Sequence, residues 1–357
     1  MRSLILAAFV VLAGCTSSDA PPQPLSGASF VQQTANTSAR LQAINAVSDQ
    51  VVWVSGNQGT FGRSVDGGQI WQVGQVAGAE SLEFRDVHAI DADLAFLMTA
   101  GEGESSRIYR TQDGGASWAE VYRVREPAGF FDCMSFWDSE RGIVFSDAPD
   151  SDFMLMVTED GGDSWTRVDP GLLEDAHPGE GAFASSGTCL VTGPDGSAWF
   201  GTGASSVDTR VFRTSDYGAS WASSATPIPS LSGSSGIFTL SFLDPTTGIA
   251  LGGDFARPDS AYGHTALTAD GGMTWAMAGD SGLGGSVFGS SYVPGAPTAT
   301  VIAVAPTGSA WSTDGGLSWA GLDGENYWAV GASPQGAVWA VGPGGRISRL
   351  QTTHGES

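Results

Sequence analysis

The octapeptide TQDGGASW at residues 111–118 is the clearest pattern in the chain, because close copies of it recur five more times. The copies are SVDGGQIW at 64–71, TEDGGDSW at 158–165, TSDYGASW at 214–221, TADGGMTW at 268–275 and STDGGLSW at 312–319. Successive copies begin 44 to 56 residues apart. A repeat of that length, built from short β-prone segments, predicts the blades of a β-propeller.

Each copy is expected to form a tight hairpin turn. The aspartate accepts backbone N–H groups across the turn, glycine supplies a positive φ, and the Ser or Thr hydroxyls complete the loop. The tryptophan then starts the next strand and packs into the blade core. The first copy has Ile70 in place of the usual Ser or Thr, which removes one hydroxyl bond and leaves the turn intact. The six aspartates are therefore predicted to be structural: Asp66, Asp113, Asp160, Asp216, Asp270 and Asp314.

A seventh unit lacks this turn but has three expected strands, at 327–330, 337–341 and 346–350. Its fourth strand is predicted at 30–33, near the other end of the chain, because such a strand closes the ring and removes exposed sheet edges. The expected fold is all-β, a seven-bladed propeller over residues 29–350 followed by a tail at 351–357.

The N-terminus has the features of an export signal. Arg2 precedes an apolar run that is too short to span a bilayer permanently, so residues 1–14 are predicted to be a signal peptide. LAGC at residues 12–15 resembles a bacterial lipobox, which implies lipidation of Cys15 and a lipidated N-terminus and linker over 15–28. The alternative is an ordinary signal peptide that contains a cysteine. The predicted location is the cell envelope, lipid-anchored and facing the periplasm or exterior, with no other contact with the membrane.

Composition restricts the partners. The 357 residues include 38 Asp and Glu against 15 Lys and Arg, all of them arginine, which makes the formal net charge -23. Such a surface repels a polyanion and excludes a nucleic-acid binder that follows phosphates. The acid excess and the missing lysines indicate either adaptation to high salt or, for the lysines alone, codon bias in a GC-rich genome.

Function is expected on the face opposite the repeated turns, where innermost strands start and second strands end. Alignment of six innermost strands places a set of mainly aromatic residues at equivalent positions. These rings either form a rim that stacks ligand groups or plug the axis between blades. The aligned residues are Gln42, Arg85, Phe131, Phe238, Phe288 and Trp328.

The same face is predicted to collect acidic residues, with Arg85, Arg107, Arg210 and His264 on or near it. Crowded carboxylates beside arginines shift one another's pKa values, so they can perform acid–base chemistry or bind calcium. Chance clustering in an acidic chain is the alternative. Asp86 belongs to the binding-face candidates, and the weak catalytic candidates are Asp132, Asp147, Glu180 and Asp254.

Cys133 and Cys189 are expected at similar depths in neighbouring blades. Export permits a disulfide, but the spacing of strands in different blades can exceed the Cα limit, so buried free thiols remain the alternative. The four histidines show no zinc-ligand spacing, and no CxxC sequence is present.

The six copies resemble Asp boxes, or BNR repeats. Together with GIALG at 248–252 and AVGPGGR at 340–346, they make the chain similar to the photosystem II stability/assembly factor-like family, whose bacterial relatives are often named "oxidoreductase" or BNR-repeat proteins. This resemblance implies a non-catalytic, monomeric binding or assembly platform for a membrane or envelope protein complex, with no cofactor. The family's arginine patch contrasts with the acidity of this chain.

The alternative function is a glycoside hydrolase of sialidase-like fold, which uses an arginine triad, a Tyr–Glu pair and an aspartic acid. Arg85, Arg107 and Arg210 with Tyr327 or Tyr262 are candidates, but the Arg-Ile-Pro string typical of sialidases is absent. No motif supports oxidoreductase chemistry.

Overall fold

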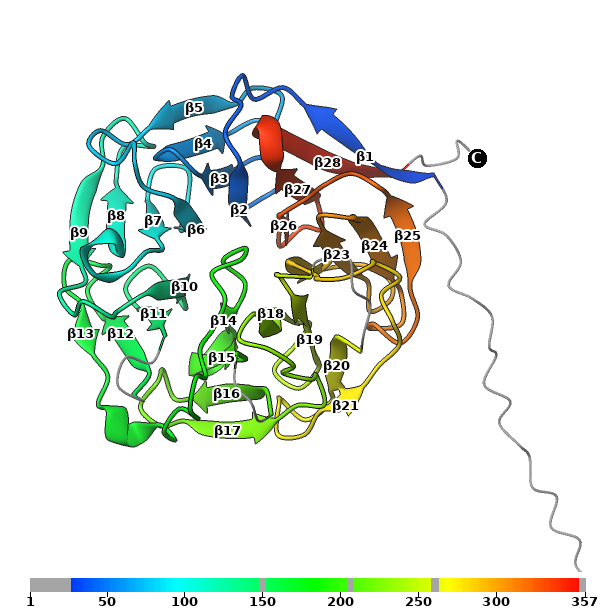
Figure 1. Cartoon of the computed structure of the whole chain (residues 1–357). Coiled ribbons are helices and arrows are strands. Elements are labelled where there is room, and N and C mark those ends of the chain that lie inside the picture. Colours follow the sequence, from blue (N-terminus) through cyan, green and yellow to red (C-terminus); the bar gives the residue numbers. More distant parts are fainter. Residues whose placement is uncertain (1–26, 148–151, 205–207, 258–262, 353–357) are drawn as a thin grey trace, which may run out of the picture.

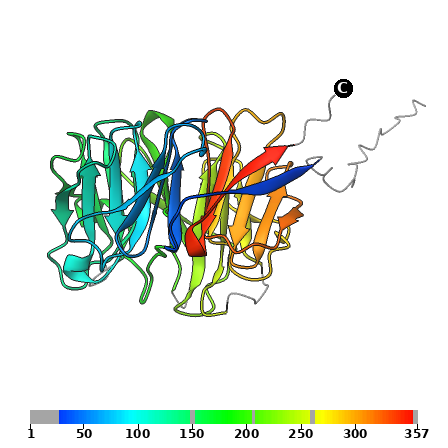
Figure 2. The same cartoon turned by 90° about the horizontal axis from the view of Figure 1, so that it is seen from above.

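Seven four-stranded antiparallel sheets are arranged as blades around a central axis in the computed structural model (Figure 1). Seen from the side, the ring is a flat disc with the strands of each blade running between its two faces (Figure 2). The structure describes residues 27–147, 152–204, 208–257 and 263–352. The predicted signal peptide, Cys15 and Tyr262 lie outside these residues. Within them, no helix has the length and apolar character needed to cross a membrane.

Blades 1 to 4 follow one another along the chain, each with its first strand nearest the axis. Blade 1 consists of β2 (Leu41–Ala46), β3 (Val52–Gly56), β4 (Thr60–Ser64) and β5 (Gln72–Gln75). Blade 2 consists of β6 (Phe84–Ala89), β7 (Ala95–Thr99), β8 (Arg107–Thr111) and β9 (Ala119–Arg123). Blade 3 consists of β10 (Phe131–Phe136), β11 (Gly142–Ser146), β12 (Met154–Thr158) and β13 (Thr166–Arg167). Blade 4 consists of β14 (Leu190–Thr192), β15 (Ser197–Gly201), β16 (Arg210–Ser215) and β17 (Ala222–Ala225).

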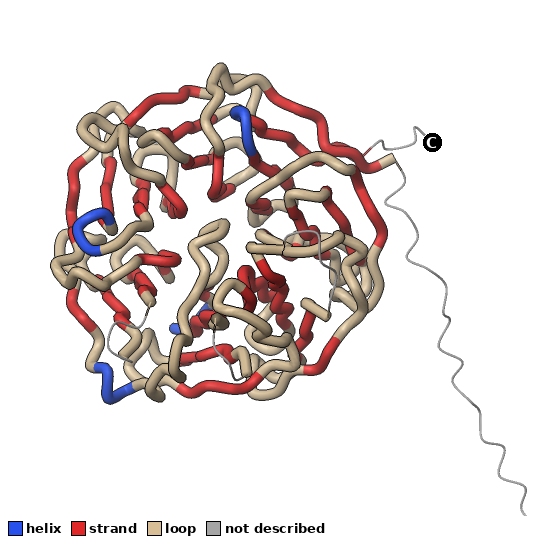
Figure 3. Tube along the Cα trace, viewed as in Figure 1, coloured by secondary structure: helices blue, strands red, loops and turns tan. Residues whose placement is uncertain are grey.

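Blades 5 to 7 complete the ring. Blade 5 consists of β18 (Ser235–Phe242), β19 (Gly248–Asp254), β20 (Thr265–Thr268) and β21 (Ala276–Met277). Blade 6 consists of β22 (Gly289–Tyr292), β23 (Val301–Ala305), β24 (Gly308–Ser312) and β25 (Ala320–Asp323). Blade 7 consists of β26 (Ala329–Ala332), β27 (Val338–Gly342), β28 (Arg346–Thr352) and β1 (Ala28–Gln33). The described helices are single 3-10 turns in the connections (Figure 3): Gly103–Ser105, Pro170–Leu172, Pro194–Gly196 and Pro343–Gly345.

The ring closes as predicted, because β1 pairs with β28 in antiparallel register, with Phe30 opposite Leu350. Strands from the two ends of the chain therefore share blade 7 and hold the ring shut. The first and last blades also pack together, since Trp71 and Trp339 lie in one apolar cluster. The predicted seven-bladed, all-β fold is confirmed.

The apolar core lies between the blades. Each sheet packs against a neighbour on both faces, so its second strand is buried throughout, as in β7, β11 and β23. This explains why those strands read as continuous apolar runs rather than as alternating patterns. The tryptophan of each repeat also packs at such an interface. Trp118 of blade 2, for example, contacts Trp53 and Phe61 of blade 1 with ring centroids 6.1 and 5.1 Å apart.

The repeated turns contain the hydrogen bonds expected of them. Asp113 accepts from the Thr111 hydroxyl at 2.8 Å and from the Ser117 amide and hydroxyl at 2.8 and 2.6 Å. Gly115 has φ +87°, which an L side chain rarely adopts. In the first copy, the Ile70 amide still donates to Asp66 at 2.9 Å, so that turn survives without the hydroxyl. All six turns join the third and fourth strands of their blades and lie on one face of the disc.

Candidate functional site

An open cavity of about 770 Å³ lies around the axis on the face opposite the repeated turns. Starts of innermost strands, ends of second strands and the connection from β13 to β14 surround it. Seven of the predicted residues line it: Arg85, Asp132, Asp147, Glu180, Phe238, Phe288 and Trp328. Arg40, Phe130, Phe183 and Phe255 also line it and were not predicted. The face that was expected to carry the function therefore contains a cavity.

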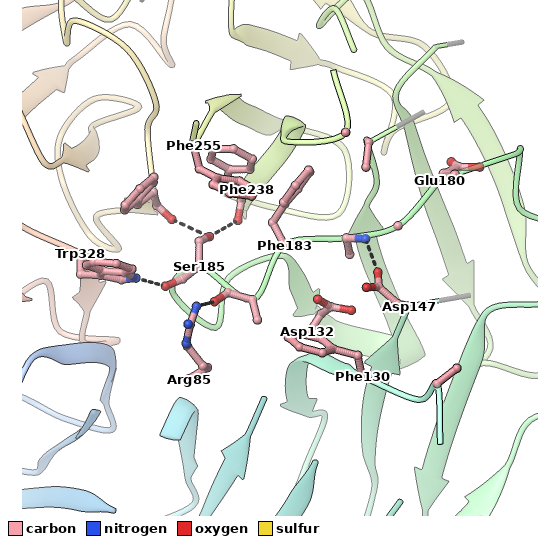
Figure 4. A pocket seen from close by; sticks show the side chains of 18 of the residues that line it. Arg85, Phe130, Asp132, Asp147, Glu180, Phe183, Ser185, Phe238, Phe255 and Trp328 are labelled. Atoms are coloured by element: carbon pink, nitrogen blue, oxygen red, sulfur yellow. Dashed lines mark hydrogen bonds between the residues drawn. The ribbon is translucent and has the colours of Figure 1, made fainter. Parts of the chain in front are cut away.

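A plug loop, residues 181–188, crosses the axis from blade 4 (green, reaching the centre of Figure 1). The Arg85 guanidinium donates to the carbonyl of Ala184 at 2.9 Å, and the indole of Trp328 donates to the carbonyl of Ser185. The Ser185 hydroxyl donates to the Phe238 carbonyl at 3.1 Å. The loop is thus bonded to blades 2, 5 and 7 and forms the floor of the cavity (Figure 4). Sequence reasoning missed it, although the 56-residue interval after Asp160 was a signal of extra chain in this blade.

A disulfide joins Cys133 of β10 to Cys189, just after the plug loop, with the Cα atoms 5.9 Å apart. Of the two alternatives that the sequence left open, the structure therefore has the disulfide and not the free thiols. The innermost strands β10 and β14 of these neighbouring blades are in contact, and the Cα separation lies within the range that a disulfide requires. The bridge attaches the plug loop to blade 3.

The residues that reach the axis from four innermost strands sit at β-bulges. The strand register shifts by one at Gln42, Arg85, Asp132 and Phe238 in β2, β6, β10 and β18. A bulge leaves one residue outside the ladder and redirects its side chain, and such bulges are common beside functional sites. In blade 3 the bulged residue is Asp132, so the sequence alignment was one residue out of register. Phe131 is not at the rim but is completely buried between blades 2 and 3, and Phe130 lines the cavity instead.

The aromatic residues both pack on one another and line the cavity. The ring centroids of Phe183, in the plug loop, and Phe238 are 4.6 Å apart, and those of Phe288 and Trp328 are 5.0 Å apart. These rings form one cluster. Phe255, at the end of blade 5, is 54% exposed and extends this wall toward solvent. The rings therefore pack together at the axis and also present apolar surface to the cavity, while stacking on a ligand stays a prediction.

Asp132 and Asp147 form a neighbouring carboxylate pair on the opposite wall (Figure 4). Asp132 is 1% exposed, its carboxyl interacts with the backbone amide and the carboxyl of Asp147, and no basic side chain of the described residues forms an ion pair with it. Burial, and then the charge of Asp147, raise the pKa of Asp132 well above its usual value. Asp147 accepts from the Ala182 amide at 2.7 Å, and burial raises its pKa despite that bond. Both carboxyls are therefore inclined to hold a proton.

Glu180 lines the cavity but is saturated by other contacts. Its carboxylate accepts from the Arg210 guanidinium at 2.5 and 3.0 Å, from the Thr202 hydroxyl at 2.6 Å and from the His177 amide at 2.8 Å. Both side chains of this ion pair are almost completely buried. Such a pair holds the connection before the plug loop against blade 4, which is a structural role.

The remaining candidates do not line the cavity. Asp254 accepts from Ser232, Ser234 and Arg257; burial opposes the effect, but these bonds lower its pKa. Asp86 is buried beneath the plug loop, where it accepts from the Met134 amide at 2.6 Å and where burial raises its pKa well above the usual value. Gly187 must be glycine here, because a Cβ would lie 2.3 Å from Asp86. His264 is buried in blade 5, with Nε2 2.9 Å from the Ser281 hydroxyl.

The arginines predicted to converge are separated. Arg107 pairs with Glu120 in blade 2, and Arg210 pairs with Glu180. The two arginines at the cavity, Arg40 and Arg85, both pair with Glu83 at 3.0 and 2.8 Å. No tyrosine of the described residues lines the cavity. The sialidase arrangement is therefore not assembled from the residues proposed for it. No group of three or more acidic, His or Cys side chains in the described ranges is placed to hold a metal ion.

No protein-family profile and no curated protein sequence matches the chain. Solved structures do share its fold. YCF48 bound to a D1 peptide superposes with a TM-score of 0.66 at 16% identity, covering 93% of this chain and 99% of the other. Streptogramin B lyase superposes at 0.67 with 10% identity, covering 91% and 98%, and an ancestral GH74 enzyme at 0.64 with 15% identity, covering 89% and 46%. The predicted resemblance is thus confirmed at the level of the fold, which these similar structures use for both binding and catalysis.

Proposed function

We propose that the chain is a non-catalytic binding or assembly platform of the cell envelope, anchored through a lipid on Cys15. The propeller acts as a monomer. Its partner is a polypeptide of a membrane or envelope protein complex, and that polypeptide binds in the cavity. The lipid anchor provides its attachment to the membrane. The role is similar to that implied by the photosystem II assembly factor resemblance.

The observation that carries this proposal is the composition of the cavity. Its wall combines a partly exposed aromatic surface, Phe255 and Trp328, with Arg40 and Arg85 at the rim. Aromatic residues and arginine are enriched at the energetically important centres of protein interfaces. The solved complex of YCF48 with a D1 peptide supports the proposal, because it is a similarly folded propeller that binds a polypeptide.

The test is a pull-down of the full chain from native membranes, with Phe255→Ser and Trp328→Ala as cavity variants. Leu317→Ser is the matched control, because Leu317 is 63% exposed in a repeated turn on the opposite face. A specific partner that is lost in the cavity variants and kept by the control supports the proposal. Capture that is insensitive to the cavity variants contradicts it.

A second candidate is a glycoside hydrolase, which the Asp132–Asp147 pair favours. One carboxyl that holds a proton beside another carboxyl is the chemical requirement of glycosidic acid catalysis. Hydrolysis of a polysaccharide by the purified chain, abolished by Asp132→Asn, would establish this activity in place of the binding role.

A further inference from the structure

Asp132 is an unusual side chain for a folded protein, because it is 1% exposed and the group it interacts with, Asp147, is another acid rather than a base. A buried carboxyl in that condition loses free energy unless something pairs with it. Every other acid around the cavity has a partner: Glu83 has two arginines, Glu180 has Arg210, and Asp147 has the Ala182 amide. The interactions of Asp132 are mainly with Asp147, which is another acid. Among the described residues no basic side chain forms an ion pair with either carboxyl, so the pair has room for a cationic ligand.

The arginines of the cavity already share a carboxylate, although Arg40 Nε has no hydrogen-bond partner among the described residues. Arg85 directs Nε and Nη2 to Glu83 and Nη1 to the Ala184 carbonyl. Arg40 also pairs with Glu83, and its guanidinium lies over the Trp328 ring at 4.8 Å. These positive charges already interact with the plug loop and with one shared carboxylate, whereas no arginine of the described residues forms an ion pair with Asp132 or Asp147.

The apolar wall fits the same kind of ligand. Phe130 and Phe183 flank Asp132 in Figure 4, and Phe238 and Phe255 continue that surface toward the mouth of the cavity. The stem of a long basic side chain is apolar and packs on such rings while its charged end reaches a carboxylate, and a cation also gains from the ring faces.

We propose that the cavity binds a basic side chain, lysine or arginine, presented by the partner polypeptide, with the Asp132–Asp147 pair as its counter-charge. The inference rests on the proposed function and adds the chemistry that the partner must have. The net charge of -23 attracts a basic segment from a distance, and the absence of lysine from the chain leaves the pair without an internal ammonium competitor.

The test uses two peptides that differ only at the charged group, acetyl-Ala-Lys-Ala-amide and acetyl-Ala-norleucine-Ala-amide. Each is titrated calorimetrically into the full chain solubilised in detergent at pH 7.5. We expect the wild type to bind the lysine peptide about ten-fold more tightly than the norleucine peptide. Asp132→Asn and Asp147→Asn should reduce the lysine peptide to the norleucine level. The matched control is Asp195→Asn, an exposed acid on the opposite face whose φ of +57° asparagine accepts.

Binding should also depend on pH, because a cation is held only by an ionised carboxylate. The charged groups that act on Asp132 are Asp147, directly after β11 of blade 3, and Arg85 of blade 2. Glu180 lines the same cavity. Wild-type affinity for the lysine peptide should rise between pH 5 and pH 8, and Asp132→Asn should remove most of that rise. A pH dependence that persists unchanged in Asp132→Asn would assign it to another group and contradict the inference.

Carbodiimide coupling gives a second readout. It joins a carboxyl to an amine, and the chain has no lysine of its own, so adducts of the lysine peptide locate where its ammonium binds. Mass spectrometry should find them on Asp132 or Asp147 in excess over Asp195. Equal affinity for the two peptides, no binding of either, or adducts spread evenly over surface acids would each overturn the inference. The pull-down with the Phe255 and Trp328 variants tests the proposed function independently of the carboxylate pair. A partner captured equally by wild type and Asp132→Asn would therefore refute this inference and leave the proposed function standing.

Discussion

Replacing Cys133 and Cys189 together by alanine should destabilise the propeller by a predictable amount. The bridge closes a sequence separation of 56 residues. In the chain-entropy description, freeing a loop of that length returns about 14 cal/mol/K to the unfolded chain, or about 4 kcal/mol at 25 °C. Unfolding entropy of roughly 2.1 cal/mol/K per residue over about 320 residues converts this to a fall in Tm of about 6 °C.

Urea unfolding followed by tryptophan fluorescence measures the change in the free energy of unfolding. The variant should lose about 4 kcal/mol with a larger m-value, because its unfolded state is less compact. Reduced wild-type protein is the matched control and should behave like the alanine variant. A difference below about 1 kcal/mol between the variant and oxidised wild type would refute the reasoning, since the bridge would then not restrict the unfolded chain as described.

Three further predictions concern charge. The pKa of buried Asp132 is raised in the folded state, so its unfavourable contribution to the free energy of unfolding grows as pH rises above the unfolded pKa of about 3.8. Asp132→Asn should therefore raise the Tm at pH 7 by a few degrees, and thermal scans should show that gain shrinking toward pH 4. A gain independent of pH would contradict the assignment. Hydrogen bonds from Ser164 and Thr158 lower the pKa of Asp160, in a repeated turn, to about 2, so Asp160 stabilises the fold above pH 3.8 and that contribution is lost as pH falls through about 2. Asp160→Ala should therefore lower the Tm at pH 7. An unchanged Tm would show that the turn does not depend on the carboxylate. If the acidic surface is adapted to high salt, the Tm should rise from low salt to molar salt, and a flat response would leave codon bias as the explanation of the missing lysines.

Periodicity predicted most of the cavity because it determines which ends of the strands meet at which face. Arg85, Asp132 and Asp147 were placed correctly for that reason, without any knowledge of their contacts. The failures were of a finer kind. The alignment placed Phe131 at the axis, whereas the bulge of blade 3 is at the next residue, Asp132, and Phe131 is buried between blades. A bulge adds one residue to a strand, so the alternation of side chains between the two faces of the sheet shifts by one residue. No local residue type marks the bulge here.

The fold itself follows from local chemistry. Asp, Gly and Ser or Thr close the same turn six times, tryptophan follows each turn, and apolar strands of about five residues fill the intervals. Each of these features depends only on residues close together in the sequence, so it can be predicted wherever its residues occur. Even the closure by β1 follows from local counting, because the seventh unit is one strand short and a sheet edge must be covered.

The chemistry at the axis depends instead on contacts between distant parts of the chain. The plug loop is held by hydrogen bonds to residues about 50 to 140 positions away, and the disulfide joins residues of two neighbouring blades that are 56 positions apart. Whether an aspartate pairs with hydroxyls and an arginine, as Asp254 does, or faces another acid, as Asp132 does, depends on which neighbours the ring places around it. The sequence alone therefore determined the propeller and the face that carries the site. Only the tertiary structure decided which charges there are already paired, because hydrogen bonding and burial are properties of the assembled ring.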